Sequence, residues 1–178
     1  MELAVSTSGP DETQAWGERL AAALVASDCT ELVVDLRGDL GAGKTVFVRG
    51  LGRALGVPAH VPIASPTFTI ARSYSLPGPG LQELHHLDAY RLGGVDDLEA
   101  AGFEDMCGNG RLTCVEWGGH VEDALPEDRL FIALAHAVLL DAAPDAAAAG
   151  GRQLIFRAGG ARSAVVLAAL QGLPEAHA

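Results

Sequence analysis

Lysine is almost missing from this sequence of 178 residues, which has 12 basic residues against 23 acidic ones and a formal net charge of −11. Nucleic-acid-binding faces are basic, so this balance argues against a broad face of that kind on the chain itself. It is compatible with docking onto a basic protein partner. The one lysine is Lys44, and the other eleven basic residues are arginines.

Cysteines are few and long apolar runs are absent. Cys29, Cys107 and Cys114 are odd in number and form no C-x-x-C pair, which predicts small buried side chains in a reducing cytosol. The longest apolar stretches, at 20–26 and 131–140, are too short to cross a bilayer. No basic segment precedes an apolar run at the N-terminus, so no signal peptide is indicated. We therefore expect a cytoplasmic protein that does not bind a membrane.

Length and composition predict a single globular domain. A hydrophobic content of 49% and a mean hydropathy of +0.23 are typical of a chain with a large core. We expect this domain to span residues 1–172. The alanine-rich segment 141–151 predicts a variable loop, and residues 173–178 predict a mobile tail.

The most informative stretch is 38–45 (GDLGAGKT), which matches the phosphate-binding pattern G-x-x-x-x-G-K-[ST]. It follows an apolar, β-branched run at 31–37 that predicts a buried strand. Gly38, Gly41 and Gly43 permit a tight turn in which several backbone N–H groups converge on one anion. The stretch therefore predicts a P-loop.

The residues that close the P-loop supply its charge and its metal ligand. Lys44 can reach the β- and γ-phosphates of a nucleotide, and the Thr45 hydroxyl can bind Mg²⁺. A slim, flexible point charge suits this position better than a planar guanidinium, which fits the use of the chain's only lysine here. A helix beginning near Lys44 would direct its positive end at the same phosphates.

Apolar periodicity and turn signals predict the remaining elements of an α/β fold. Residues 60–69 contain two prolines and predict an ordered loop. We expect further strands at 2–6, 69–76, 81–87, 112–115, 128–138 and 152–157, and helices at 13–26, 44–55, 96–101 and 163–170.

Two acidic residues stand at the ends of predicted strands, Asp88 and Glu116. A doubly wound sheet places the carboxyl ends of its strands at the ligand crevice, so both can face the phosphates. Hydrolysis needs a carboxylate for Mg²⁺ and a group that orients water. We assign Glu116 to Mg²⁺, and Asp88 either to the water or to the metal's outer shell.

The histidines have no partners at metal-ligand spacing. His85 and His86 are adjacent, so in a strand their side chains point to opposite faces and cannot form a two-ligand site. We interpret all six histidines as structural. Trp117 follows Glu116 directly and predicts half-buried packing near the site.

Five segments carry a family resemblance when they are taken in order. They are 11–13 (DET) with 17–18 (GE), the P-loop 38–45, 65–68 (SPTF), 86–92 (HLDAYRL) and 115–117 (VEW). With this series the sequence resembles the TsaE family, the small bacterial ATPases of tRNA threonylcarbamoyladenosine biosynthesis. The P-loop alone is unspecific, whereas the full ordered series is highly specific.

The resemblance implies a P-loop NTPase-like fold of three layers, with a central mixed, partly antiparallel sheet flanked by helices. It implies that Thr45 and Glu116 hold Mg²⁺ and that Asp88 is needed for hydrolysis, with Lys44 as the third catalytic residue. The segment 65–68 is similar to a switch-like loop that faces the γ-phosphate. The residues implied to bind ATP are Thr13, Gly38, Asp39, Leu40, Gly41, Ala42, Gly43, Lys44, Thr45, Val46 and Thr67.

The resemblance also implies partners, the proteins TsaD and TsaB. In the family, TsaD transfers the threonylcarbamoyl group to the adenosine beside the anticodon, and nucleotide turnover by the ATPase resets the assembly. The implied contact with tRNA is therefore indirect, which fits the acidic balance of the chain.

Two alternatives remain open on the residues. A small-molecule P-loop kinase has a suitable length, but such kinases close an arginine-bearing lid over the phosphates, and the arginines here are scattered. A non-hydrolysing module could instead use bound nucleotide to select a partner-binding conformation. Phosphorylation of a hydroxyl acceptor would identify the kinase, and nucleotide-dependent affinity for a partner would identify the module.

Overall fold

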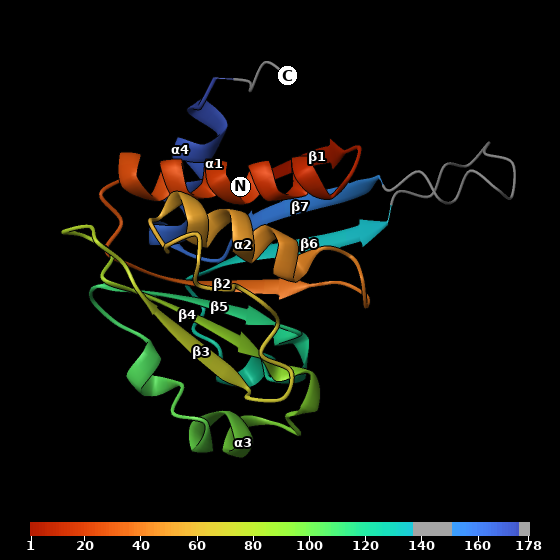
Figure 1. Cartoon of the computed structure of the whole chain (residues 1–178), viewed down its shortest axis with the longest axis vertical. Coiled ribbons are helices and arrows are strands. Elements are labelled where there is room, and N and C mark those ends of the chain that lie inside the picture. The colour runs from red at the N-terminus through yellow and green to blue at the C-terminus, as the bar shows by residue number, and fades with distance from the viewer. Residues whose placement is uncertain (137–150, 175–178) are drawn as a thin grey trace, which may run out of the picture.

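A seven-stranded mixed sheet organises the structure, a computed structural model that describes residues 1–136 and 151–174 (Figure 1). The strands run in the order β1-β7-β6-β2-β5-β4-β3. Their bounds are Glu2–Thr7 (β1), Glu31–Arg37 (β2), Ala71–Ser75 (β3), Glu83–Asp88 (β4), Arg111–Glu116 (β5), Arg129–His136 (β6) and Arg152–Ala158 (β7).

The sheet has a parallel centre and antiparallel margins. β6, β2, β5 and β4 are parallel neighbours, so their carboxyl ends lie along one edge. β3 pairs antiparallel with β4 at one margin, and β7 pairs antiparallel with both β6 and β1 at the other. This arrangement confirms the mixed, partly antiparallel sheet that the family resemblance implied.

Helices cover both faces of the sheet and complete three layers (Figure 1). One face packs against α1 (Pro10–Ala26), α2 (Lys44–Ala54) and α4 (Ala161–Gly172), in a core that includes Leu24, Phe47, Leu84 and Phe156. The opposite face has a smaller core, which is closed by α3 (Val95–Ala100) and short 3₁₀ turns at Ala89–Arg91, Glu104–Met106, Gly118–His120 and Glu122–Ala124.

The central strands read as continuous apolar runs because both of their faces are covered. In β2, Leu32, Val34 and Leu36 join the larger core, whereas Val33 joins the smaller one. Asp35 also points to the smaller-core face and is fully buried. The parallel centre thus holds a buried carboxylate away from the P-loop side of the sheet.

The predicted elements are present with small shifts at their ends. The largest shift is in α1, which begins at Pro10 rather than Thr13. Proline at the first helical position fixes the backbone for the helix and needs no N–H partner, and Asp11 and Glu12 complement the helix dipole. No helix within 1–136 or 151–174 is long and apolar enough to span a membrane.

Some predictions fall on residues outside the described part. They are the variable loop at 141–151 except for Gly151, the end of the strand expected at 128–138, and the tail beyond residue 174. The cysteines within the described ranges are all free, and Cys114 is fully buried. Burial raises the pKa of the Cys114 thiol.

Candidate functional site

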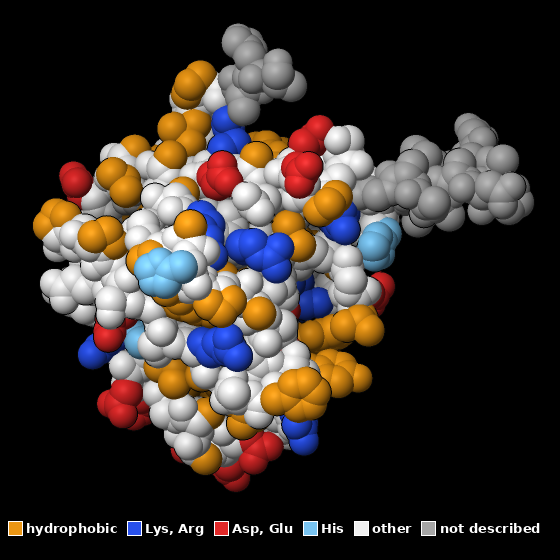
Figure 2. All heavy atoms as spheres, viewed as in Figure 1, with side chains coloured by type: hydrophobic (Ala, Val, Ile, Leu, Met, Phe, Trp, Pro, Cys, Tyr) orange, Lys and Arg blue, Asp and Glu red, His pale blue; other side chains and the backbone are white. Residues whose placement is uncertain are grey.

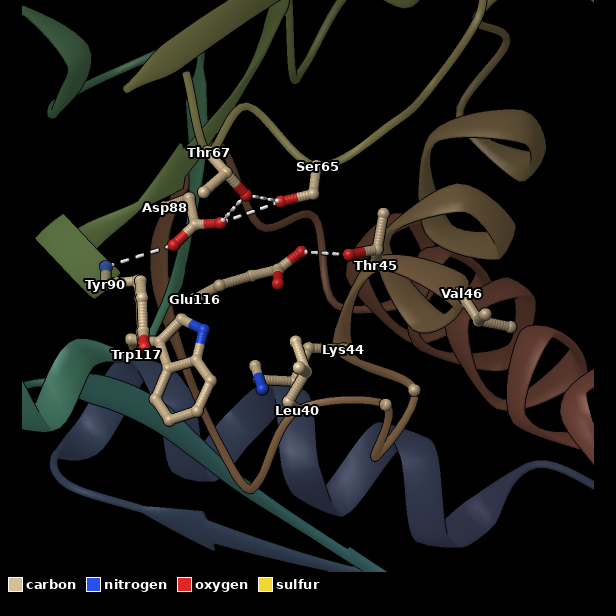
Figure 3. A pocket seen from close by; sticks show the side chains of 12 residues that line it. Leu40, Lys44, Thr45, Val46, Ser65, Thr67, Asp88, Tyr90, Glu116 and Trp117 are labelled. Atoms are coloured by element: carbon tan, nitrogen blue, oxygen red, sulfur yellow. Dashed lines mark hydrogen bonds between the residues drawn. The ribbon is translucent and has the colours of Figure 1, made fainter. Parts of the chain in front are cut away.

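A cavity of about 470 Å³ lies at the carboxyl ends of the central strands, in the size range of small-ligand sites. The P-loop and the start of α2 form one wall, and the ends of β4 and β5 form the other (Figure 3). The lining residues are Leu40, Gly41, Gly43, Lys44, Thr45, Val46, Ser65, Thr67, Asp88, Tyr90, Glu116 and Trp117.

The P-loop has the backbone geometry that its glycines predict. Gly43 has a φ of 106° and directly precedes α2, whose first helical residue is Lys44. A side chain is strained at that angle, so glycine is needed there. Gly38 allows a close approach instead, because a Cβ at this position would lie 2.1 Å from the carbonyl oxygen of Leu134. The amino end of α2 consequently faces the cavity.

Lys44 is held inside the P-loop. Its ammonium donates hydrogen bonds to the carbonyl oxygens of Gly38, at 2.7 Å, and Asp39, at 2.9 Å. Burial lowers the pKa of Lys44, while the nearby carboxylates of Glu116 and Asp88 act in the opposite direction. The ammonium therefore lies between the loop backbone and two acidic side chains.

Trp117 forms the floor beside Lys44, whose Nζ is 3.9 Å from the centre of the indole (Figure 3). Its backbone has a φ of 61°, a conformation that costs a non-glycine residue about 1–3 kcal/mol. Two contacts hold it there: its N–H donates to the Leu36 carbonyl at 3.0 Å, and its ring packs against Tyr90 with centres 5.0 Å apart. This strained turn directs the indole toward the cation of the P-loop.

Glu116 ends β5 and reaches across to the P-loop helix. Its Oε1 accepts a hydrogen bond of 2.7 Å from the Thr45 hydroxyl and one of 2.8 Å from His86 Nε2. The Glu116 carboxylate is 3% exposed. The two residues that the sequence assigns to Mg²⁺, Thr45 and Glu116, are therefore in direct contact.

Asp88 ends β4 beside Glu116, since the two residues pair directly in the parallel register. Its Oδ2 accepts hydrogen bonds from the hydroxyls of Ser65, at 2.7 Å, and Thr67, at 2.6 Å. Its Oδ1 accepts the backbone N–H of Tyr90 at 3.0 Å. Asp88 thus ties the 65–68 loop to the end of the sheet (Figure 3).

The hydrogen bonds to these two carboxylates come from hydroxyls, an imidazole and a backbone amide. Across the described ranges neither acid forms an ion pair with an arginine or with Lys44. A buried carboxylate without a paired cation is costly, and a bound cation removes that cost.

The site fits Mg²⁺ in its chemistry, because hydroxyl and carboxylate oxygens are hard ligands of the kind that this ion prefers. Within 1–136 and 151–174, no group of three or more His, Cys, Asp or Glu residues is placed to hold a metal. A P-loop site does not need such a group, since nucleotide phosphates and water complete the coordination of the ion.

Most residues predicted to bind nucleotide line the cavity, but four do not. Gly38 and Asp39 orient Lys44 through their carbonyl oxygens, and Ala42 is fully buried. Thr13 packs behind the P-loop: its Cγ2 would be 3.2 Å from a Cβ at position 43, and its hydroxyl bonds the Gly9 carbonyl at 3.0 Å. Thr13 therefore supports the loop from α1.

Sequence reasoning assigned no part in the site to His86 or Tyr90. His85 and His86 do point to opposite faces, as predicted: His85 meets Ser73, whereas His86 meets Glu116. His86 and Tyr90 both belong to the family segment 86–92, but assigning His86 to Glu116 requires knowing that β4 and β5 are neighbours.

Known proteins are similar to this chain in sequence and in fold. The family described as Threonylcarbamoyl adenosine biosynthesis protein TsaE matches residues 7–140. Proteins named tRNA threonylcarbamoyladenosine biosynthesis protein TsaE are similar. The one from Bacillus subtilis is 37% identical over 76% of this chain and 79% of its own length, and the one from Streptomyces coelicolor is 46% identical over 68% and 78%.

A solved structure agrees with the sequence matches. The crystal structure of Bacillus subtilis YdiB aligns with a TM-score of 0.68 and 29% identity, over 96% of this chain and 95% of that one. The P-loop, the acidic strand ends and the mixed sheet described above thus occur in a chain that matches the TsaE family model over residues 7–140. The chain belongs to the TsaE family of threonylcarbamoyladenosine biosynthesis proteins.

Proposed function

We propose that this protein binds Mg·ATP in the P-loop cavity and hydrolyses it, and that it does so in the cytoplasm. The observation that carries the proposal is the contact between Thr45 and Glu116, which joins the P-loop to an acidic strand end at 2.7 Å. A glycine turn that bound no nucleotide would have no need to bury a carboxylate against that hydroxyl.

The residues of the cavity have different proposed roles. The P-loop N–H groups and Lys44 bind the phosphates, and the start of α2 adds its dipole. Thr45 and Glu116 would hold Mg²⁺, which when bound neutralises charge on the phosphates. Asp88 orients the attacking water, because its carboxylate lies beside Glu116 in the register and at the edge of the cavity.

We further propose that hydrolysis supports TsaB and TsaD in the threonylcarbamoylation of tRNA adenosine beside the anticodon. Two large apolar side chains are almost fully exposed on loops that contribute to the cavity: Leu40, at 88%, lines it, and Phe68, at 89%, directly follows the lining residue Thr67. Exposed apolar groups at a site mouth favour a protein partner that covers them. Basic side chains occur in small separate groups on the face in Figure 2, which favours indirect contact with tRNA.

The test is phosphate release from Mg·ATP by the purified chain, alone and with TsaB and TsaD. Slow phosphate release that rises sharply when both partners are added supports the ATPase activity and its role with TsaB and TsaD. Phosphate release that does not change when TsaB and TsaD are added would contradict their proposed involvement. Phosphorylation of a hydroxyl acceptor would indicate a kinase instead. A matched pair, wild type and Lys44→Ala, assigns the activity to this cavity.

A second candidate, a module that binds partners according to its nucleotide, is favoured by the same exposed pair. Leu40 belongs to the P-loop and Phe68 follows Thr67, so both are on segments that line the cavity. Partner affinity measured with ATP, with ADP and without nucleotide tests this candidate. Equal affinity in all three conditions would exclude it.

A further inference from the structure

His86 is a polar side chain in an apolar part of the core. It is fully buried on β4, on the face that packs against α2, with Leu84 before it on the same strand and Cys114 opposite it on β5. An aliphatic residue of similar size would fill this position without burying a polar group. Packing alone therefore does not explain the imidazole.

The imidazole has one polar contact, and that contact is at the proposed metal site. Nε2 donates to Glu116 Oε1 at 2.8 Å, whereas Nδ1 is buried and has no hydrogen-bond partner in the described part of the chain. Since His86 pairs with Cys114 in the register, Glu116 is its diagonal neighbour, two residues farther along β5. This diagonal contact brings the ring nitrogen to the strand end.

The two hydrogen bonds to Glu116 converge on the same oxygen. Thr45 and His86 both donate to Oε1, at 2.7 Å and 2.8 Å. Together they restrict the rotation of the carboxyl group, and within the described part of the chain Oε2 accepts no hydrogen bond. A residue that orients a metal ligand in this way affects metal affinity without touching the metal.

We propose that His86 is a positioning residue that holds the Glu116 carboxylate in the orientation needed to bind Mg²⁺. The inference rests on the proposed function, because it takes Glu116 as a ligand of that ion. It adds a specific requirement: an N–H group must be located where Nε2 lies, and neither the ring nor its Nδ1 atom is needed.

The substitutions His86→Gln and His86→Asn test this requirement. The amide N–H of glutamine can reach the position of Nε2, whereas that of asparagine falls short near the position of Nδ1. The matched control is His85→Asn, which changes the neighbouring buried histidine on the opposite face, where its ring contacts Ser73. All three variants replace a buried histidine of β4 with an amide.

The primary readout is binding of a fluorescent ATP analogue as Mg²⁺ is titrated, with thermal unfolding measured in parallel. We expect His86→Asn to raise the half-saturating Mg²⁺ concentration about 10–100-fold, the usual cost of losing such a partner. His86→Gln should restore most of the Mg²⁺ affinity, and His85→Asn should leave it unchanged. Binding in EDTA should be alike in all variants.

Equal Mg²⁺ dependence in His86→Asn and wild type would overturn the proposal. So would an equal loss in His86→Gln and His86→Asn, which would indicate that the ring matters only for packing. If the asparagine variant does not fold, His86→Met has a similar volume without an N–H, and the same loss is expected. Nucleotide binding by the wild type that is independent of Mg²⁺ would overturn the proposed function itself.

Discussion

Buried acidic side chains lie on both faces of the parallel centre of the sheet, and their surroundings differ. Asp35, on β2, contacts Arg37 at 2.9 Å and Arg129 at 3.2 Å, and both arginines also reach Glu122. Glu116 and Asp88, on the other face, are held by hydroxyl, imidazole and amide donors.

This difference distinguishes an acid with a structural role from acids that can bind a ligand. The Asp35 carboxylate is paired with two arginines of the chain, so it does not need a cation from a ligand. Through these arginines it joins strands β2 and β6 to the turn at Glu122–Ala124. The Glu116–Asp88 pair is fixed in place without being neutralised. A cation brought by a ligand, together with Lys44, would complete its charge balance.

The largest expected effect is at Lys44, the P-loop cation that lies near Glu116 and Asp88. Lys44→Ala should lower nucleotide affinity or turnover by about 100-fold or more, because it removes the charge that meets the phosphates. Lys44→Arg is the matched variant and should also be impaired, since a planar fork does not fit the loop carbonyls. Phosphate release by Lys44→Ala at the wild-type rate would contradict the site.

Glu116→Gln should remove the Mg²⁺ dependence of phosphate release and slow it by about 100-fold, an effect of the size seen when a preorganised polar group is lost. Its free energy of unfolding should be unchanged or higher, because the variant no longer buries an unpaired carboxylate. Urea unfolding checks the second part. A strongly destabilised Glu116→Gln protein would show that this acid is structural, like Asp35.

Asp35→Ala is the reverse experiment on the other face. It should lower the free energy of unfolding by about 3 kcal/mol, because it removes the buried partner of two partly buried arginines and leaves them only the exposed Glu122. Nucleotide affinity and its Mg²⁺ dependence should stay at the wild-type level in the folded protein. Loss of Mg²⁺ dependence without loss of stability would abolish the distinction between the two clusters.

The smallest effect concerns His85, a buried titratable group outside both clusters. Burial lowers its pKa below the ordinary value of 6.5, although Glu83 acts in the opposite direction. As the pH falls through 6.5 the unfolded chain takes up a proton before the folded one, so stability decreases below that pH. His85→Gln should lose less stability than wild type between about pH 8 and about pH 5 in urea unfolding. An equal loss would show that other groups set the acid sensitivity.

Much of this site could be predicted from the sequence because its parts are local. The P-loop is a continuous stretch whose glycines, lysine and threonine have fixed offsets. Asp88 and Glu116 could be placed because each follows an apolar run that ends at the same edge of a sheet. The strands expected at 69–76 and 81–87 could likewise be placed from local alternation and turn signals.

The rest depends on contacts between distant segments. His86 and Glu116 are separated by 30 positions, and Arg129 lies 94 positions from Asp35. Neither pairing can be predicted without the strand order, and the residues alone did not give the antiparallel margin at β7. The strained turn at Trp117 has no sequence signal either, because tertiary packing maintains its unfavourable φ.

The most direct measurement is calorimetric titration of ATP into wild type and Glu116→Gln, each with Mg²⁺ and with EDTA. The account predicts that Mg²⁺ tightens binding by wild type and has no such effect on Glu116→Gln, while the two proteins bind alike in EDTA. Equal enhancement by Mg²⁺ in both proteins would contradict the assignment of the uncompensated carboxylates as the cation site.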